Sequence, residues 1–334
     1  MPLLVRSACL TNYVEVCDSL DIDPYALLKS HNINAACLTD PDKKVSTDAI
    51  GRLLEASAAA AGVEDFGLRM AETRRLSNLG PLGMLAREEP TIRKALESLQ
   101  HYLHLHNEGI VFRLEEANGI AVLREEIITE GKLPITQAVD LSQAVTLRIL
   151  RVLLGAGWAP RRVCFRHRPP RDASSYLRVF GPRVEFNSDI DGIVCRSDDL
   201  DAKIENADPV TARYIHRSLD ALAAQSHTLV EDKVRQMIWI LLPSGLCSVE
   251  RVAQHLGLNR RTVHRQLEQH GQTFSGILDS VRAELVVRHL VDQNRSLGEI
   301  SSLLGFAAQS AFSRWFSRRF ACSPTAWRQG HGAP

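Results

Sequence analysis

The sequence predicts a multidomain protein, in which a mixed α/β (α+β) domain precedes an all-α domain with two helix-turn-helix units joined by a linker helix. Its 334 residues exceed what one hydrophobic core usually serves. Strand-like runs lie in the first two thirds of the chain, and a short helix, a glycine turn and a longer basic helix recur in the last third. We place the boundary at about Ser226, which gives domains of residues 1–225 and 226–334.

The composition is that of a globular protein. Hydrophobic residues make up 45% and charged residues 24%, which excludes disordered and collagen-like chains. No apolar run approaches the ~18 residues that span a bilayer, and the stretch before Arg6 is too short for a secretory signal. The seven cysteines are far apart and never in C-x-x-C spacing, so we expect reduced thiols. We expect a cytoplasmic protein with no membrane partner.

Helix start and stop signals open the first domain. Asp23 before Pro24 predicts a capped helix, because the carboxylate can accept from the first free N–H groups. Ser46 begins a second amphipathic helix, which Gly62 ends. Residues 91–105 have the same helical periodicity.

The pattern then changes to strands. Residues 110–115 and 120–124 flank Asn118-Gly119, which predicts a β-hairpin. A long helix, three short strands and a last capped helix follow at residues 135–154, 163–165, 184–186, 192–195 and from Asp208 onward. About five strands are too few for the ~8 that usually close a ligand-holding barrel, so a sugar-binding barrel is disfavoured.

Two helix-turn-helix units are predicted at about 248–268 and 296–320. In the first, Ser248 caps one helix, Gly257 breaks it and Asn259 caps the next. In the second, Ser296 begins a capping box and Gly305 turns the chain. Apolar residues between 274 and 290 recur at helical spacing, which predicts the linker helix.

Charge divides the chain unevenly. Residues from Ser248 onward carry a net charge of +5, whereas residues 1–247 carry −4. A basic C-terminal part that follows an acidic N-terminal part is the pattern expected when only one end of the chain binds nucleic acid.

The second helix of each unit combines an apolar face with a polar one. An α-helix fits the DNA major groove when its outer side chains reach base edges and a partner helix holds its inner face. The predicted base-reading residues are Arg260, Arg261, His264 and Arg265 in the first unit, and Gln309, Ser310 and Arg314 in the second. Arg318 and Arg319 are predicted to contact phosphates.

These residues resemble a known family. Residues 257–274, 299–316 and 323–328 resemble the DNA-binding domain of AraC/XylS-type transcription regulators. The resemblance implies base-facing roles for Arg261, His264 and Arg265, and for Gln309, Ser310, Ala311 and Arg314. It further implies double-stranded promoter DNA and RNA polymerase as partners, a possible homodimer, and activation rather than repression. Ala321 stands where the family usually has glycine, so we do not expect a left-handed helix cap there.

The first domain also resembles a known domain. Residues 65–69, 79–83, 165–167 and 180–186 resemble the ligand-sensing domain, called arabinose-binding-like, of a subset of these regulators. Members of that subset respond to varied small molecules such as amino acids and amines, so the resemblance implies an effector without implying arabinose. Cationic side chains that could bind an anionic effector are Arg69, Arg166 and His167.

Catalysis and metal binding have no candidate constellation. His101, His104 and His106 place at most two imidazoles on one face, so we interpret them as packed or solvated residues and expect no metal or cofactor. Nucleotide-binding and hydrolase motifs are missing, which argues against an enzyme with an accessory DNA-binding tail. A constitutive DNA-binding protein or repressor without an effector stays open as the alternative.

Overall fold

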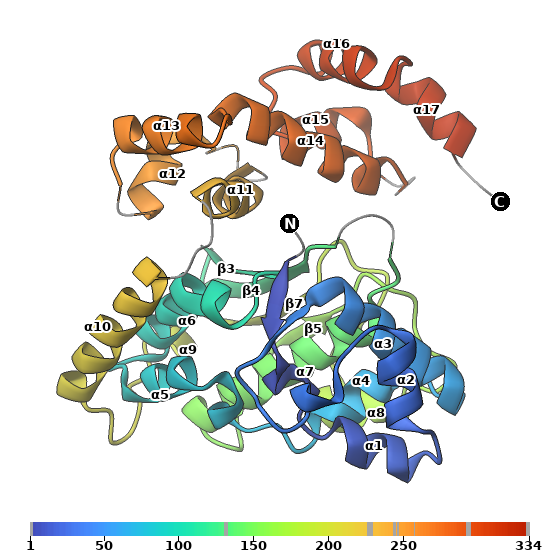
Figure 1. The fold of residues 1–334 in the computed structure, drawn as a ribbon, viewed down its shortest axis with the longest axis vertical. Helices are drawn as coiled ribbons and strands as arrows, with labels where there is room; N and C mark the ends of the chain where they lie inside the picture. Colours follow the sequence, from blue (N-terminus) through green and yellow to red (C-terminus); the bar gives the residue numbers. More distant parts are fainter. Residues whose placement is uncertain are drawn as a thin grey trace. The chain divides into compact units, whose positions relative to one another are not determined.

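The computed structural model describes residues 3–129, 133–225, 230–242, 245, 247–256, 258–291 and 295–331. The chain divides into two compact units, Met1–Ser226 and His227–Pro334 (Figure 1). Both are built mainly of helices, and the strands described belong to the first unit. None of the helices within these ranges is long and apolar enough to cross a membrane.

The first unit begins with a small helical region. Its elements are β1 (Leu4–Arg6), η1 (Ser7–Leu10), α1 (Tyr13–Ser19), α2 (Pro24–Ser30), η2 (Ala35–Cys37), β2 (Lys44–Ser46), α3 (Thr47–Ala61) and α4 (Phe66–Ala71). The predicted caps are confirmed: the Asp23 carboxylate accepts from two backbone N–H groups of α2, and Ser46 caps α3. Gly62 ends α3 in the left-handed region at φ 66°. Strands β1 and β2 pair antiparallel over three residues, too short a length for a period-2 pattern to reveal.

A mixed sheet forms the centre of the unit. Its strands are β3 (Ile110–Ala117), β4 (Ile120–Ile127), β5 (Arg162–Cys164), β6 (Val184–Glu185) and β7 (Gly192–Arg196). In the described residues these five strands are ordered β3-β4-β7-β5-β6, with β5 and β6 parallel and the other pairs antiparallel. The predicted hairpin is confirmed, and Asn118 and Gly119 both have positive φ, as a type I′ turn requires.

Helices pack with this sheet to form the larger of two hydrophobic clusters. They are η3 (Leu76–Leu79), α5 (Pro81–Glu88), α6 (Ile92–His106), α7 (Thr136–Leu154), α8 (Ser174–Phe180), α9 (Ser197–Leu200) and α10 (Pro209–Gln225). Leu96, Leu123 and Leu147 are buried in this cluster. A smaller cluster around Tyr13 and Leu53 joins β1 and α1–α4. The first unit therefore has two packed regions with a seam between them.

The second unit is helical throughout the part that the structure describes. Its elements are α11 (Val230–Leu241), α12 (Val249–His255), α13 (Arg260–Gln269), α14 (Phe274–Val291), α15 (Leu297–Leu303), α16 (Gln309–Phe320) and α17 (Pro324–His331). Ser248 and Asn259 cap α12 and α13, and Ser296 with Glu299 forms the predicted capping box of α15. The turn residue Gly257 lies outside the described residues.

The linker helix α14 is held to the second helix-turn-helix by Arg282. Its Nε and Nη2 atoms donate to the carbonyl oxygens of Leu304 and Gly305, at 2.9 and 3.1 Å. The same guanidinium lies 4.1 Å from the ring centroid of Phe306. Gly305 is the turn residue of this unit, with φ 65°, so these contacts of Arg282 stabilise the turn directly.

The expectation for Ala321 is wrong. This residue ends α16 in the left-handed region, at φ 56° and ψ 17°. Its N–H donates to the carbonyl oxygen of Ser317, which closes the last helical turn. The following helix is fixed by buried Trp327 and by Arg328, whose Nη2 atom donates to the carbonyl oxygen of Arg295 at 2.8 Å. Tertiary anchoring of α17 thus imposes a conformation that alanine disfavours.

Candidate nucleic-acid interface and effector cavity

Helix α13 turns an apolar face inward and basic side chains outward. Val263 and Leu267 are buried in the unit's core, whereas Arg261 and Arg265 are exposed and His264 is partly exposed. The Asn259 side chain accepts from the backbone N–H of Thr262 at 2.8 Å and fixes where the helix starts. This is the arrangement that groove insertion requires of a recognition helix.

Arg260 differs from its neighbours on α13. Its Nη1 atom lies 2.9 Å from Oε1 of Glu250 on α12. Both side chains are more than half exposed, and an ion pair of this kind contributes little to stability. Arg260 is therefore tied to its own unit, although a DNA phosphate could compete for it.

Helix α16, like α13, has a buried apolar face and an exposed polar face, but its buried residues are aromatic. Phe312 and Phe316 are fully buried, and Gln309, Ser310 and Arg314 are exposed. Arg318 and Arg319 are exposed further along the helix, and Ala311 is partly buried. Beside this helix, Nε1 of Trp315 donates to Oδ1 of Asp279 on α14 at 3.1 Å, which holds the linker helix against it.

The outward arginines of the two helices are available for a partner. Among the described residues, no carboxylate lies within ion-pair distance of these five side chains, which are Arg261, Arg265, Arg314, Arg318 and Arg319. A guanidinium is always charged and carries five N–H donors. Exposed, unpaired guanidinium groups on two second helices therefore form a surface that suits an anionic polymer.

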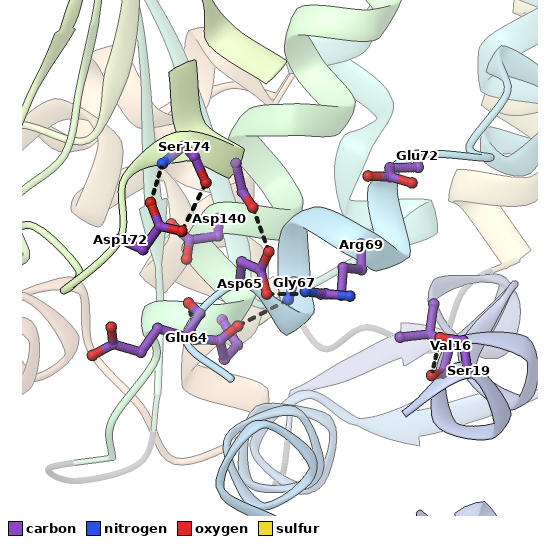
Figure 2. A network of polar contacts seen from close by, with 12 residues as sticks. Val16, Ser19, Glu64, Asp65, Gly67, Arg69, Glu72, Asp140, Asp172 and Ser174 are labelled. Carbon is purple, nitrogen blue, oxygen red and sulfur yellow. Dashed lines mark hydrogen bonds and ion pairs between the residues drawn. The ribbon is translucent and has the colours of Figure 1, made fainter. Parts of the chain in front are cut away.

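Arg69 lines a shallow, open pocket with Ser175 and Arg178, and it takes part in a local polar network. Its Nε atom is 2.7 Å from Oδ1 of Asp65, one turn earlier on the chain, and Figure 2 shows this pair. The Ser175 hydroxyl also donates to Asp65. Burial raises the pKa of Asp65, but the hydrogen bonds from Arg69 and Ser175 outweigh burial and lower that pKa overall. The network holds α4 to α8.

His167 is likewise partnered inside the first unit. Its Nε2 atom lies 3.0 Å from Oδ1 of fully buried Asp140, and the Tyr176 hydroxyl donates to Oδ2 at 2.6 Å. Burial lowers the pKa of His167, but the bond to Asp140 more than compensates and raises it. The backbone N–H of Arg166 donates to Asp191 at 2.8 Å, and its Nε atom donates to the carbonyl oxygen of Asp189 at 3.0 Å. These contacts fix the loop after β5.

A cavity of about 160 Å³ lies elsewhere in the first unit, lined by β1, η1, α3, η3, α6, α7 and the β3–β4 hairpin. Its wall is mostly aliphatic and includes Ile50, Leu54, Leu99 and Phe112. The predicted effector residues Arg69, Arg166 and His167 are not among the described residues of this wall. Concave, largely apolar cavities with a few polar groups are typical small-molecule sites.

Two buried ionisable side chains lie in the cavity wall, and the sequence analysis missed both. Glu125 of β4 is 4% exposed and accepts hydrogen bonds from the hydroxyls of Ser142 and Thr146 on α7. Arg74 is 5% exposed, and its Nη atoms donate to the carbonyl oxygens of Ala8 and Cys9. Burial raises the pKa of Glu125.

A sequence signal for Glu125 existed. Ala121, Leu123 and Glu125 alternate along β4 and share its buried face, so the glutamate stands where a third apolar residue is expected. Arg74 has no such signal, because it lies in an irregular segment between α4 and η3.

The three histidines of α6 do not form a metal-binding cluster with other described residues. In the part of the chain that the structure describes, no group of three His, Cys, Asp or Glu side chains could hold a metal ion. His106 instead lies in the cavity wall, where its Nδ1 atom is 3.3 Å from Nη1 of Arg6. Burial and the positive charges of Arg6, Lys44 and Arg74 lower the pKa of His106 to about 3. All seven cysteines are free thiols.

A chain that combines two helix-turn-helix units with a unit that contains a largely apolar cavity has the features of a transcription regulator with a sensing domain. Residues 22–204 match the family described as "Arabinose-binding domain of AraC transcription regulator, N-term", and residues 252–330 match a helix-turn-helix domain family. The chain belongs to the AraC family of transcription regulators, and it is a DNA-binding regulator of that type.

Curated relatives span nearly the whole chain. The HTH-type transcriptional regulator VirS of Mycobacterium tuberculosis is 29% identical over 97% of this chain and 96% of its own length. The ornithine utilization regulator of Pseudomonas aeruginosa is 28% identical over 91% of this chain and 90% of its own. The crystal structure of transcriptional regulator CdpR from Pseudomonas aeruginosa has a TM-score of 0.46 at 18% identity, covering 92% of this chain and 96% of that chain.

Proposed function

We propose that the protein is an effector-responsive transcription activator, with residues 1–225 as the sensing and dimerisation domain and residues 226–334 as the promoter-binding domain. The observation that carries this proposal is the set of exposed arginines on α13 and α16 that have no ion-pair partner in the described part of the chain. Its partners are double-stranded promoter DNA, RNA polymerase, a small-molecule effector and a second copy of the chain. We place its activity in the cytoplasm, without an enzymatic step.

The base-reading roles follow from exposure. Arg265 and Arg314 each stand on the outer face of a recognition helix, where a guanidinium can donate twice to guanine O6 and N7. Gln309 suits adenine in the same way. Arg261, His264 and Ser310 complete the two surfaces, and Arg260 joins them once DNA displaces Glu250. With both helices on one face of the duplex, their sites lie about one helical turn, ~34 Å, apart.

The phosphate roles belong to the far end of α16. Arg318 and Arg319 lie in its last turn, beyond the base-facing residues, and both are exposed. A side chain that contacts phosphate positions the helix without reading sequence. These two residues therefore supply affinity and salt dependence.

The switch operates through the equilibrium between states of the regulator. An effector that binds one state more tightly shifts the population toward that state, and DNA affinity follows from the shift. The cavity supports this mechanism, because its wall takes residues from both hydrophobic clusters of the first unit.

Binding to a selected operator and to random duplex at equal salt tests the proposal. Specific recognition gives at least a thousandfold gap between the two dissociation constants. An architectural DNA-binding protein gives almost no gap at any salt concentration. The same titration repeated with cell metabolites separates an effector-responsive regulator from a constitutive one.

A further inference from the structure

The cavity between the two hydrophobic clusters has polar groups that define what it can bind. We propose that it is the effector site and that the effector is a small zwitterion, whose carboxylate pairs with Arg74 and whose ammonium group pairs with Glu125, on a short apolar chain. This inference rests on the proposed function, because it names the ligand class of the sensing domain.

Arg74 supplies the anion-binding end. Its guanidinium is buried, its Nη atoms donate to two backbone carbonyls, and its Nε atom has no hydrogen-bond partner among the described residues. No described carboxylate lies within ion-pair distance of it. A guanidinium cannot shed its charge by losing a proton in a protein, so the positive charge stays uncompensated in the wall. A ligand carboxylate would supply the missing partner.

His106 reports the same positive potential. Its imidazole is in the wall, where burial lowers its pKa most and the positive charges of Arg6, Lys44 and Arg74 lower it further. Arg6 is paired with Asp42, and Lys44 lies 4.0 Å from Glu108, so Arg74 is the cation of this group left for a ligand.

Glu125 supplies the cation-binding end. Its oxygens accept from the two hydroxyls of Ser142 and Thr146, and no lysine or arginine among the described residues pairs with it. Hydroxyl donors orient the carboxylate without neutralising it. Burial raises the pKa of Glu125 and favours its neutral form, and an ammonium group in the cavity would supply the countercharge that stabilises the carboxylate.

The wall between these groups sets the size and character of the ligand body. Ile50, Leu54, Leu96, Leu99 and Phe112 are apolar and buried. At about 160 Å³, the cavity is similar in volume to an engineered apolar cavity that binds benzene. The ligand therefore has roughly six to ten non-hydrogen atoms.

Gly51 keeps part of this space open. It is buried in the interior of α3 and belongs to the wall, and a Cβ atom placed on it would meet nothing within 4 Å. Glycine destabilises a helix interior relative to alanine. At this position no neighbouring atom is close enough to exclude a larger side chain. A larger side chain at this position would grow into the cavity without disturbing Arg74 or Glu125.

Calorimetry on the full chain tests the ligand class with three probes of one length: 5-aminopentanoate, pentanoate and pentylamine. We expect 5-aminopentanoate to bind at least tenfold more tightly than either single-charge probe. Equal binding of pentanoate or pentylamine would overturn the zwitterion assignment. Failure of all three at millimolar concentration, in a chain that still selects its operator, would overturn this inference while leaving the proposed function intact.

Variants assign each charge to its residue. Arg74→Met should weaken 5-aminopentanoate at least tenfold and leave pentylamine unchanged, whereas Glu125→Gln should leave pentanoate unchanged. Arg113→Met and Glu89→Gln are matched controls, because both residues are buried and neither is in the wall. Equal losses in a variant and its control would contradict the assignment.

Gly51→Leu tests the site without removing a charge. It should abolish binding of all three probes while the chain keeps its operator preference and thermal stability. This outcome also covers the case in which Arg74→Met does not fold. Unchanged binding in a folded Gly51→Leu protein would show that the probes bind elsewhere.

Discussion

The arginines of the two units are placed differently. Many in the first unit are tied to acids, as in Arg93 with Glu116 and Arg162 with Glu185, or are buried like Arg74, and exposed ones such as Arg52, Arg87 and Arg213 lie on separate helices. On the recognition helices of the second unit they are exposed and, apart from Arg260 with Glu250, unpaired within the described residues. The comparison teaches that exposed guanidinium groups gathered on the outer face of a helix, rather than exposed arginines as such, mark a surface for nucleic acid.

The largest effect on stability is expected at Arg282, an arginine of the second unit that is hydrogen-bonded within the fold. Arg282→Met removes two hydrogen bonds to the Leu304 and Gly305 carbonyls and the stacking on Phe306. We expect a loss of about 2 to 4 kcal/mol in the unfolding free energy, measured by denaturant titration. Base preference should survive in the folded fraction. A variant that kept its stability and lost only base choice would break the comparison.

The exposed arginines of the recognition helices should affect base choice and leave stability almost unchanged. Arg265→Ala and Arg314→Ala should each cost about 1 to 3 kcal/mol at one base pair and relax choice there, with little change in stability. Dissociation constants for operators substituted at single positions measure this.

Arg318→Ala is the matched control for those variants, because it removes an exposed arginine from the same helix as Arg314. It should weaken all duplexes similarly and reduce the salt slope by about one. Uniform loss from Arg265→Ala would contradict its base-reading role.

The first unit should be sensitive to acid because His106 is buried and has cations close to it. Its pKa is lowered from 6.5 to about 3 in the folded state, so the folded state resists protonation. The stability contributed by neutral His106 is complete above pH 6.5 and is lost as the pH falls toward 3. His106→Gln should therefore reduce the loss of unfolding free energy between pH 7 and pH 5 by up to about 2 kcal/mol. An identical loss in both proteins would place the acid sensitivity elsewhere.

The smallest effect concerns backbone conformation rather than charge. Ala321→Gly should stabilise the second unit by about 1 kcal/mol, because glycine adopts φ 56° without the clash that a Cβ atom creates. Thermal denaturation of the full chain measures it. A decrease in stability would mean that this cap is not left-handed in solution.

Local chemistry explains what the sequence could predict. The caps at Asp23, Ser46 and Ser296, the turn at Asn118-Gly119 and the inward faces of α13 and α16 depend on residues close in the chain. The fold class followed from these elements, whereas the family followed from the resemblance of residues 257–274, 299–316 and 323–328.

The cavity could not be predicted in the same way. Gly51, Arg74 and Glu125 are far apart in sequence, and only the packing of α3, β4 and α7 brings their surroundings into one wall. Arg69, Arg166 and His167 carried a charge signal, but each is partnered within the fold and absent from the described wall. At Ala321, anchoring of α17 outweighed the residue's own preference.

Selection from a randomised duplex pool tests most directly the claim that free arginines on α13 and α16 read DNA. The account predicts that the full chain enriches a motif with two blocks about one helical turn apart, and that Arg265→Ala and Arg314→Ala each blur a different block. A properly folded chain that enriched no motif, or two variants that blurred the same positions equally, would contradict it.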